Sequence, residues 1–300
     1  MIYLPEPWEG ELLSSALTRG AKCFGRDSRM MSLAHFGERC LCHPQYPKHV
    51  PTFAELWGER WTTEELIANH TLYPLTAPFV EPELRERLLD WMHGNPSGRR
   101  RVSGRMLEGT LLSTYRYCPK CWAEQERTSR GDQGWLRAWQ VPGNRICLRH
   151  GEALMDTGES FRDRFGATRN IDWSDIDLSK ARPLAAQKHD EELSRTICRL
   201  LGRPLEHLPT SEQWKSYWDN RLAEISAAEL SDAGAEYWGP DWLVEMGIEK
   251  ISRRVIEGTR SRVWWRHLLL LKAVDPQADL VEAINTAAKI KTDIKVKDNN

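Results

Sequence analysis

Apolar residues in the first hundred positions recur three and four residues apart, and a glycine ends each run, which is typical of short amphipathic helices. The first helix is predicted from about Glu9 to Cys23, ending at Gly25, and the second from Asp27 or Ser28 to Gly37. Two helices joined by a tight, glycine-containing turn indicate a helix-turn-helix motif, although any small helical hairpin shares this pattern. The side chains expected to be buried are Leu12, Leu13, Ala16 and Leu17 in the first helix and Met30, Met31, Ala34 and Phe36 in the second.

Capping signals continue this helical region to about residue 95. The pairs Thr52–Glu55 and Thr62–Glu65 have the spacing of a capping box, which marks the start of a helix. A further helix has Pro82 in its first turn and ends at Gly94. Residues 1–95 are therefore predicted to form an N-terminal helical domain with a helix-turn-helix motif. The stretch that follows is rich in glycine, serine and arginine, which predicts a basic linker over residues 96–111.

Helical periodicity returns beyond residue 160. One helix is predicted to end at Gly202, and capping boxes at Thr210–Gln213 and Ser226–Glu229 open the next two, which form a second helix-turn-helix candidate. A strongly apolar helix follows around Val263 to Val274. Residues 161–300 are therefore predicted to form a C-terminal helical domain, and the chain as a whole to be mainly α.

The segment between these regions has few helical signals and contains paired cysteines. Cys118-Pro-Lys-Cys121 is followed, after 25 residues, by Cys147-Leu-Arg-His150. A Cys-x-x-Cys turn directs two thiolates at one metal ion, and a Cys-x-x-His turn supplies a third sulfur and a nitrogen. Because four such donors leave no position for water, they indicate a structural Zn²⁺ site. The gap is longer than the roughly twelve residues of the common zinc finger, so a ribbon-like zinc-binding domain is predicted over residues 112–160.

Two other interpretations of the cysteines and histidines remain open. His150-Gly-Glu152 beside a Cys-x-x-Cys resembles the motif of the zinc deaminases, but the order is reversed and Cys147 takes the position that a catalytic zinc reserves for water. A second metal ion is the alternative for a smaller group of residues, for which core or surface roles are favoured. This group comprises Cys23, His35, Cys40, Cys42 and His43.

Charge is distributed unevenly along the chain. The net charge of −1 excludes a protein that is basic all over. Residues 94–149, however, carry eleven Arg and Lys against four Asp and Glu, a local charge of +7. This excess indicates an anionic partner, or else an ordinary solvated surface. The residues expected to contact DNA phosphates are Arg99, Arg100, Arg101 and Arg105.

Composition narrows the class of protein. A hydrophobic share of 40% and a charged share of 28% are ordinary for a globular chain. Seven cysteines without an export signal favour reduced thiols over disulfides. The longest apolar runs, such as Leu268 to Leu271, are too short to span a membrane. A cytoplasmic protein without a membrane partner is expected. No phosphate-binding glycine loop or catalytic Ser-His-acid arrangement stands out, so an enzyme is not expected.

Several short motifs resemble the TniQ/TnsD family of transposon target-selection proteins. The N-terminal ones are Glu11-Leu-Leu-Ser-Ser-Ala-Leu, His35-Phe-Gly and Glu65-Leu-Ile-Ala-Asn-His-Thr-Leu-Tyr-Pro. The central ones are Tyr117-Cys-Pro-Lys-Cys, Trp139-Gln-Val-Pro-Gly and Cys147-Leu-Arg-His-Gly. The resemblance covers roughly residues 4 to 155 and is thinner in the C-terminal half. Family members often have an acidic pair shortly after the second cysteine, where this chain has Glu124-Gln-Glu.

The resemblance implies an N-terminal helix-turn-helix domain, a zinc-finger region and a helical C-terminal part. It also implies a non-catalytic adaptor in DNA transposition that links target DNA or an RNA-guided CRISPR effector complex to an AAA+ ATPase regulator. The sequence leaves the oligomeric state open, with a homodimer as one alternative. The chain is short beside the attachment-site binders of the family. A stand-alone, sequence-specific, zinc-containing DNA-binding regulator remains the alternative. The family's zinc ligands map onto Cys118, Cys121, Cys147 and His150.

Overall fold

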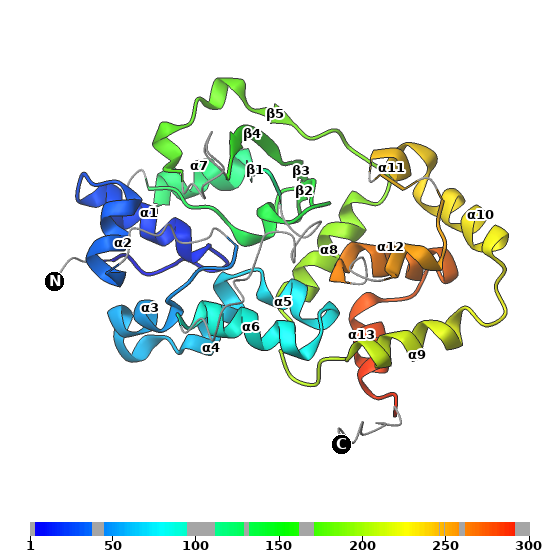
Figure 1. The fold of residues 1–300 in the computed structure, drawn as a ribbon. Coiled ribbons are helices and arrows are strands. Elements are labelled where there is room, and N and C mark those ends of the chain that lie inside the picture. The colour runs from blue at the N-terminus through cyan, green and yellow to red at the C-terminus, as the bar shows by residue number, and fades with distance from the viewer. Residues whose placement is uncertain are drawn as a thin grey trace, which may run out of the picture. The chain divides into compact units, whose positions relative to one another are not determined.

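The computed structural model describes residues 4–37, 45–94, 112–128, 132–161, 171–245, 247–248, 250–257 and 262–291. It confirms a mainly α-helical protein with a few short strands (Figure 1). Among the described residues, no helix is both long and apolar enough to cross a membrane. The helices are α1 (Leu13–Cys23), α2 (Ser28–Phe36), α3 (Val50–Trp57), α4 (Thr63–His70), α5 (Tyr73–Thr76), α6 (Pro82–Met92), α7 (Pro119–Thr128), α8 (Asp190–Leu201), α9 (Ser211–Arg221), α10 (Ala227–Trp238), α11 (Pro240–Glu245), α12 (Trp264–Val274) and α13 (Leu280–Ala288).

The chain divides into two compact units. The first comprises Met1–Leu75 and Glu83–Pro204, and the second comprises Thr76–Pro82 and Leu205–Asn300. This is not the division into residues 1–95, 112–160 and 161–300 expected from the sequence, because the N-terminal helices and the cysteine segment share one unit. The predicted linker over residues 96–111 lies outside the described residues. Periodicity shows that a helix buries one face, but not which segment covers that face.

The N-terminal region of the first unit begins with an extended segment, not a helix. Glu11 forms an isolated antiparallel bridge with Leu136, so α1 starts at Leu13 and not at Glu9. Helix α2 has the expected bounds, because the Asp27 side chain accepts a hydrogen bond from the backbone N–H of Met30 and Gly37 ends the helix at a φ of 69°.

Two details of the predicted helices are wrong. On α2 only Met31 of the four expected core residues is buried, and Met30 is 43% exposed. Successive helical residues point about 100° apart, and on α2 the core covers the side of Met31 but not that of Met30. The capping box predicted at Thr52 is absent because α3 begins earlier, at Val50, whereas the capping box of Thr62 and Glu65 is present.

Short antiparallel strands frame the cysteine segment. Strand β4 (Met155–Ser160) lies between β1 (Thr114–Tyr117) and β5 (Arg182–Pro183), and β2 (Ile146–Cys147) pairs with β3 (Glu152–Ala153). Figure 1 shows these strands close to α7, all in the green part of the chain. Helix α7 was not expected, because it is mostly polar and buries only Cys121 and Trp122, which leaves no apolar stripe for a sequence pattern to detect.

A buried hydrogen-bond network around the ion pair of Glu11 and Arg19 joins the N-terminal region to the segment that precedes η4 (Arg137–Gln140). Glu11 is fully buried, and Arg19 donates two 2.8 Å hydrogen bonds to its two carboxylate oxygens. Ser15 donates to the same carboxylate at 2.7 Å and accepts from the backbone N–H of Trp135 at 2.8 Å. A Cβ on Gly134 would lie 2.4 Å from Glu11 Oε1, so the close approach requires glycine. Glu11 therefore connects α1 to the core around the cysteines.

His70, at the end of α4, is held by the same region. Its Nδ1 lies 2.8 Å from the carbonyl oxygen of Glu11, which only accepts, so Nδ1 carries the proton. The ring packs edge-on against Trp61 and is 1% exposed, and its Nε2 has no hydrogen-bond partner among the described residues. Burial lowers the pKa of His70 to about 4, and the charge of Arg137 adds to this effect. The folded protein therefore holds this imidazole neutral.

This neutral histidine predicts a loss of stability in acid. The unfolded chain binds a proton at His70 near pH 6.5, whereas the folded chain binds it only near pH 4. The contribution of neutral His70 to the free energy of unfolding is therefore complete above about pH 6.5 and is lost as the pH falls. We expect the free energy of unfolding to decrease by about 2.5 kcal/mol between pH 7 and pH 4.5 from this group alone. Urea unfolding of the wild type and of His70→Gln at both pH values isolates the effect. Equal pH dependence in the two proteins would contradict the assignment.

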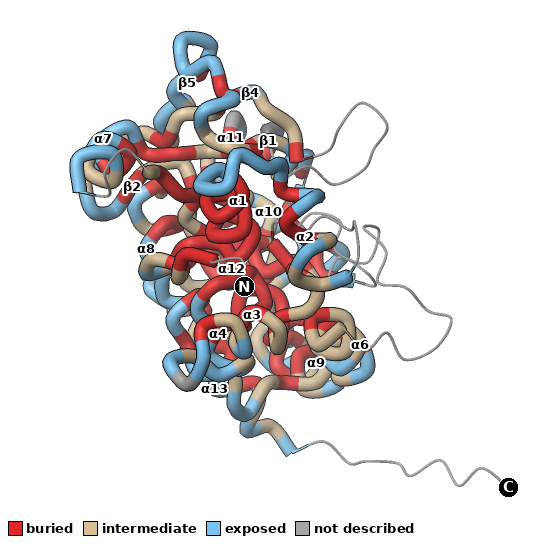
Figure 2. The backbone as a smooth tube through the Cα atoms, turned by 90° about the vertical axis from the view of Figure 1, so that its left-hand side faces the viewer, coloured by how far each residue is buried: buried red, intermediate tan, exposed pale blue. Residues whose placement is uncertain are grey.

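The second unit is wholly helical in its described part. Helices α9 and α10 open with the predicted capping boxes at Thr210 and Ser226. Figure 2 shows α12 mostly as buried backbone, as expected of its apolar sequence. Helix α9 packs chiefly on α13, and the Gln213 side chain donates a 2.9 Å hydrogen bond to the carbonyl oxygen of Ala288. Helix α10 packs chiefly on α12, and the Trp238 indole donates a 3.1 Å hydrogen bond to the carbonyl oxygen of Leu269. Each of these two helices packs chiefly on another partner, so the contacts do not confirm the predicted helix-turn-helix of α9 and α10.

Candidate metal centre

Four local elements carry the predicted ligands. Cys118 directly follows β1, and Cys121 lies in the first turn of α7, which begins at Pro119. Cys147 ends β2, and His150 lies in the tight turn to β3. The backbone N–H groups of His150 and Gly151 both donate to the Cys147 carbonyl, at 3.2 and 2.7 Å. This turn folds the imidazole back toward the thiol three residues before it.

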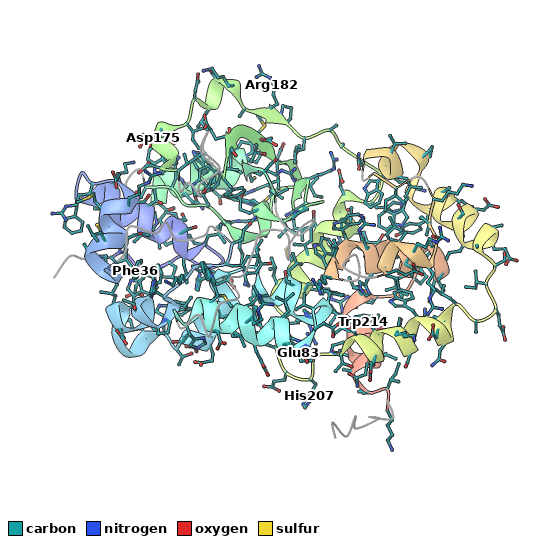
Figure 3. All side chains as sticks on the ribbon, viewed as in Figure 1. Phe36, Glu83, Asp175, Arg182, His207 and Trp214 are labelled. Atoms are coloured by element: carbon teal, nitrogen blue, oxygen red, sulfur yellow. The ribbon has the colours of Figure 1, made fainter. Side chains whose placement is uncertain are left out.

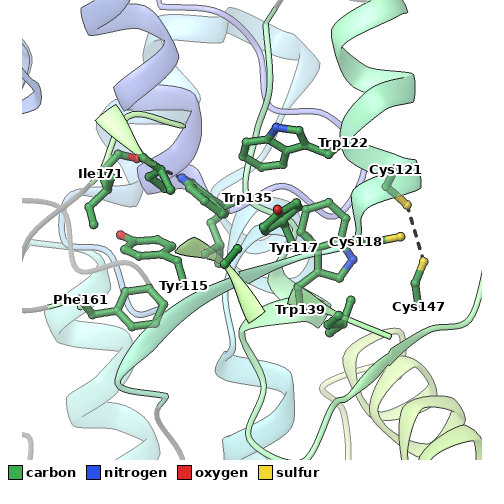
Figure 4. Packing of buried hydrophobic residues seen from close by; sticks show 14 residues of the cluster. Tyr115, Tyr117, Cys118, Cys121, Trp122, Trp135, Trp139, Cys147, Phe161 and Ile171 are labelled. Carbon is green, nitrogen blue, oxygen red and sulfur yellow. Dashed lines mark hydrogen bonds between the residues drawn. The ribbon is translucent and has the colours of Figure 1, made fainter. Parts of the chain in front are cut away.

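These elements bring the four side chains together. The Cys121 and Cys147 sulfurs are 3.6 Å apart (Figure 4). His150 Nδ1 lies 3.5 Å from the sulfur of Cys118, 3.3 Å from that of Cys121 and 3.7 Å from that of Cys147. All four donor atoms lie within 4.8 Å of one another, the three thiols are buried and the imidazole is half-buried. The sequence-predicted ligands therefore form one group that can hold a metal ion.

The thiols influence one another strongly at these distances. Hydrogen bonds from Cys118 and Cys121 lower the pKa of Cys147, whereas hydrogen bonds with Cys118 and Cys147 raise the pKa of Cys121. One thiolate in the group thus opposes ionisation of its neighbour, because like charges repel at close range. A bound cation removes this conflict by stabilising all three thiolates together.

A carboxylate orients the histidine from behind. His150 Nε2 lies 3.2 Å from Glu124 Oε1, and the Arg149 guanidinium forms an ion pair with Glu124 Oε2 at 2.9 Å. Glu124 follows Cys121 by three residues on α7, which places both on the same face of the helix. A histidine that ligates a metal usually donates its second ring N–H to such a partner. The sequence contains the acidic Glu124-Gln-Glu run, but its spacing alone assigned no role to Glu124.

The alternative sites receive no support from the described residues. Glu152, the carboxylate of the deaminase-like motif, forms a 2.5 Å ion pair with Lys120. Cys23 is exposed at the end of α1. Cys198, on α8, is also exposed. Cys40, Cys42 and His43 lie outside the described residues.

The aromatic residues of this segment form a core around the cysteines. Trp122, Trp135 and Trp139 are each 3–4% exposed and belong to the same cluster of buried residues as Cys118, Cys121 and Cys147 (Figure 4). The Trp135 indole donates to the Ile171 carbonyl at 3.0 Å. The candidate metal centre is therefore one wall of the core of the first unit.

The fold uses part of the local positive charge of residues 94–149. Arg137 is buried and donates to the carbonyl oxygens of Thr71 and Leu201, each at 3.1 Å. Lys120 and Arg149 form ion pairs beside the metal centre. Arg137 therefore serves the structure, and the charges of Lys120 and Arg149 are paired on the surface. The residues expected to contact DNA, Arg99, Arg100, Arg101 and Arg105, lie outside the described residues.

Comparisons with known proteins relate this chain to a family of transposition proteins. The chain is 27% identical over 322 aligned positions to the transposon Tn7 transposition protein TnsD of Escherichia coli. The alignment covers 97% of this chain and 61% of that protein, so the chain spans less than two thirds of its relative's length. The TniQ family model matches residues 2–154, just over half of the 300 residues, and these include all four candidate ligands. The chain therefore belongs to the TniQ family.

Proposed function

We propose that this protein is a non-catalytic target-selection adaptor in DNA transposition. It links target DNA, or an RNA-guided CRISPR effector complex, to an AAA+ ATPase transposition regulator. The observation that carries this proposal is the similarity to a transposition protein along 97% of the chain, together with the TniQ match over residues 2–154. Because the relative is longer, the partners named here belong to the proposal.

The metal of this adaptor is a structural Zn²⁺ held by the four-residue group. Tetrahedral zinc, with Zn–S of about 2.3 Å and Zn–N of about 2.0–2.1 Å, places two sulfurs about 3.8 Å apart and a sulfur about 3.6 Å from a nitrogen. The sulfurs of Cys121 and Cys147 are 3.6 Å apart, and the sulfur-to-nitrogen distances to His150 are 3.3–3.7 Å. Four protein ligands leave no position for a reactive water, which supports a non-catalytic role.

In both this function and the alternative, a stand-alone sequence-specific zinc-containing DNA-binding regulator, we propose that the first helix pair contacts DNA. Helices α1 and α2 pack on each other, and Arg26 and Arg29 are exposed at the start of α2. A recognition helix reads base edges with its N-terminal residues. Helix α10 is less suited to DNA, because it contains Glu229, Asp232 and Glu236 and no Lys or Arg.

Binding measurements with the purified chain distinguish the two functions. An adaptor binds the ATPase regulator encoded beside the same transposon, with or without DNA, and a regulator binds a defined DNA sequence and not the ATPase. Biolayer interferometry with the immobilised chain tests naked DNA, the ATPase and an assembled effector complex in turn. Sequence-specific DNA binding without any affinity for the ATPase would favour the alternative.

Neutralising the basic linker provides a quantitative test of phosphate contact. We expect replacement of Arg99, Arg100, Arg101 and Arg105 by Gln to weaken DNA binding and to reduce the slope of log K against log salt by about 0.9 for each lost phosphate contact. A matched variant with Arg195 and Arg199 of α8, both exposed, replaced by Gln controls for a general loss of positive charge. An unchanged slope in a salt titration would remove the linker arginines from the DNA-contacting surface.

A further inference from the structure

The second unit contains a cavity of about 630 Å³, bordered by the segment Thr76–Pro82, α9, η7 (Arg253–Ile256) and α12. This volume lies within the range of about 300–1,000 Å³ found for ligand-binding clefts. Its buried wall is mostly aromatic: four rings, each no more than 5% exposed, are joined by the aliphatic Ile256. The rings are those of Phe79, Trp214, Trp218 and His267. Trp214 is labelled on α9 in Figure 3.

Contacts within the wall hold these rings in place. The Phe79 and Trp214 rings stack with centroids 5.6 Å apart, and the His267 ring lies 4.5 Å from that of Trp214. The Trp214 indole N–H donates to the Pro78 carbonyl at 2.7 Å, and that of Trp218 donates to His267 Nδ1 at 3.2 Å. Because the indole N–H groups are already satisfied, the wall offers carbon surface to an occupant. It therefore suits a bulky apolar group.

The rim of the cavity carries charges of both signs. Two lining residues are carboxylates, Glu81 and Glu257, and two are cations, Lys215 and Arg253. Glu81 accepts a hydrogen bond from Ser211, and Arg253 pairs with Asp219. Lys215 and Glu257 are exposed, and their side chains have no ion-pair or hydrogen-bond partner among the described residues. A nucleic acid strand would bring phosphates against two carboxylates, whereas a peptide can match both signs.

We propose that this cavity is a docking site for a peptide segment of a partner protein. The segment inserts one bulky apolar side chain against Trp214 and Phe79 and places an acidic residue next to it, where that residue pairs with Lys215. Burial of one large side chain in a preformed aromatic pocket is the usual source of affinity in such contacts. The site goes beyond the proposed function, since it does not depend on the macromolecule that the first unit binds.

Peptide selection against the full-length protein tests the proposal. A random dodecapeptide library displayed on phage is expected to yield peptides with one Trp, Phe or Leu adjacent to Asp or Glu. Synthetic peptides of this kind then report affinity by fluorescence polarisation. Lys215→Glu should weaken binding of the acidic peptide by about tenfold. The same variant should bind more tightly than the wild type to a peptide in which Lys replaces the acidic residue. Lys291→Glu, exposed and outside the cavity lining, is the matched control and should leave both affinities unchanged.

Filling the cavity gives an independent measurement. Ser211→Phe places a ring in the cavity and should weaken every selected peptide by at least about tenfold. Peptides whose affinity is unchanged by both Lys215→Glu and Ser211→Phe, or a library that yields no apolar–acidic motif, would overturn the proposal. The proposal would also be overturned if a single-stranded 12-nucleotide oligomer bound the wild type and lost its affinity for Ser211→Phe, while the peptides bound both proteins equally well. Because Lys215 is exposed, its variant is expected to fold and to give a result even if the filled variant does not.

Discussion

Replacing Cys147 by Ala is expected to abolish metal binding and to unfold the core of the first unit. The substitution removes one of four ligands and leaves the thiols of Cys118 and Cys121 buried without the cation that stabilises them. Structural zinc contributes an apparent 10–16 kcal/mol of folding free energy in small zinc-finger peptides. This is as large as the whole free energy of unfolding of a typical domain, about 5–15 kcal/mol. We therefore expect a decrease in the free energy of unfolding of more than about 4 kcal/mol, or no folded protein at all.

Elemental analysis together with urea unfolding measures this effect. Cys198→Ala is the matched control, because Cys198 is exposed on α8 and lies outside the four-residue group. The control should keep one zinc per chain and a stability within about 0.5 kcal/mol of the wild type. Glu124→Gln keeps all four ligands and loses only the charged partner of His150, so it should fold and bind zinc about 10–100-fold more weakly.

The alternative chemistry makes the opposite prediction for Cys147→Ala. If the metal were catalytic, Cys147 would not be needed as a ligand, and the variant would retain its fold and its zinc while losing turnover. A well-folded Cys147→Ala protein with a full complement of zinc would therefore contradict the structural site.

Replacing Glu11 by Ala is expected to have the second largest effect. Arg19 would remain 4% exposed, with the Glu6 carbonyl at 2.7 Å and only a 3.4 Å contact to Asp132 to balance its charge. Removing one partner of a buried ion pair typically costs about 3–5 kcal/mol. The loss should also free α1 from the Trp135 segment, because Ser15 bonds to both Glu11 and the Trp135 backbone.

Urea unfolding followed by circular dichroism measures this loss, and hydrogen exchange locates it in α1. Glu6→Ala is the matched control: Glu6 pairs with Arg60 on the surface, where both side chains are at least 40% exposed. Exposed pairs contribute about 0–1 kcal/mol, so the control should be close to the wild type. Equal stabilities of the two variants would show that the Glu11 carboxylate is not needed for the fold.

Glu11 also explains part of the motif on which the family resemblance was based. In Glu11-Leu-Leu-Ser-Ser the carboxylate and the Ser15 hydroxyl form one buried network, and Leu12 and Leu13 enter the core. In the motif around residue 70, the His70 ring donates to the Glu11 carbonyl, so two motifs about sixty residues apart meet at one residue. Their sequences identified the family before their contacts were apparent.

The sequence by itself determined the features whose causes are local. The starts of four helices followed from capping side chains that accept a hydrogen bond from a backbone N–H three residues later. The capping residues are Asp27, Thr62, Thr210 and Ser226. The four candidate ligands followed in the same way, because each pair is separated by two residues and one turn suffices to direct both donors. Family membership also followed from short motifs, and the TniQ match confirmed it.

The tertiary structure alone decided which distant segments meet. It put Glu124 behind His150, placed α1 and α8 in the same unit as the cysteines, and packed α9 chiefly on α13 and α10 chiefly on α12. It also revealed α7, whose polar sequence has no apolar stripe because the cysteine thiol and one indole are its only buried side chains. The physical reason is the same in each case: the apolar pattern of a helix shows that one face is buried, and only packing selects the surface that covers it.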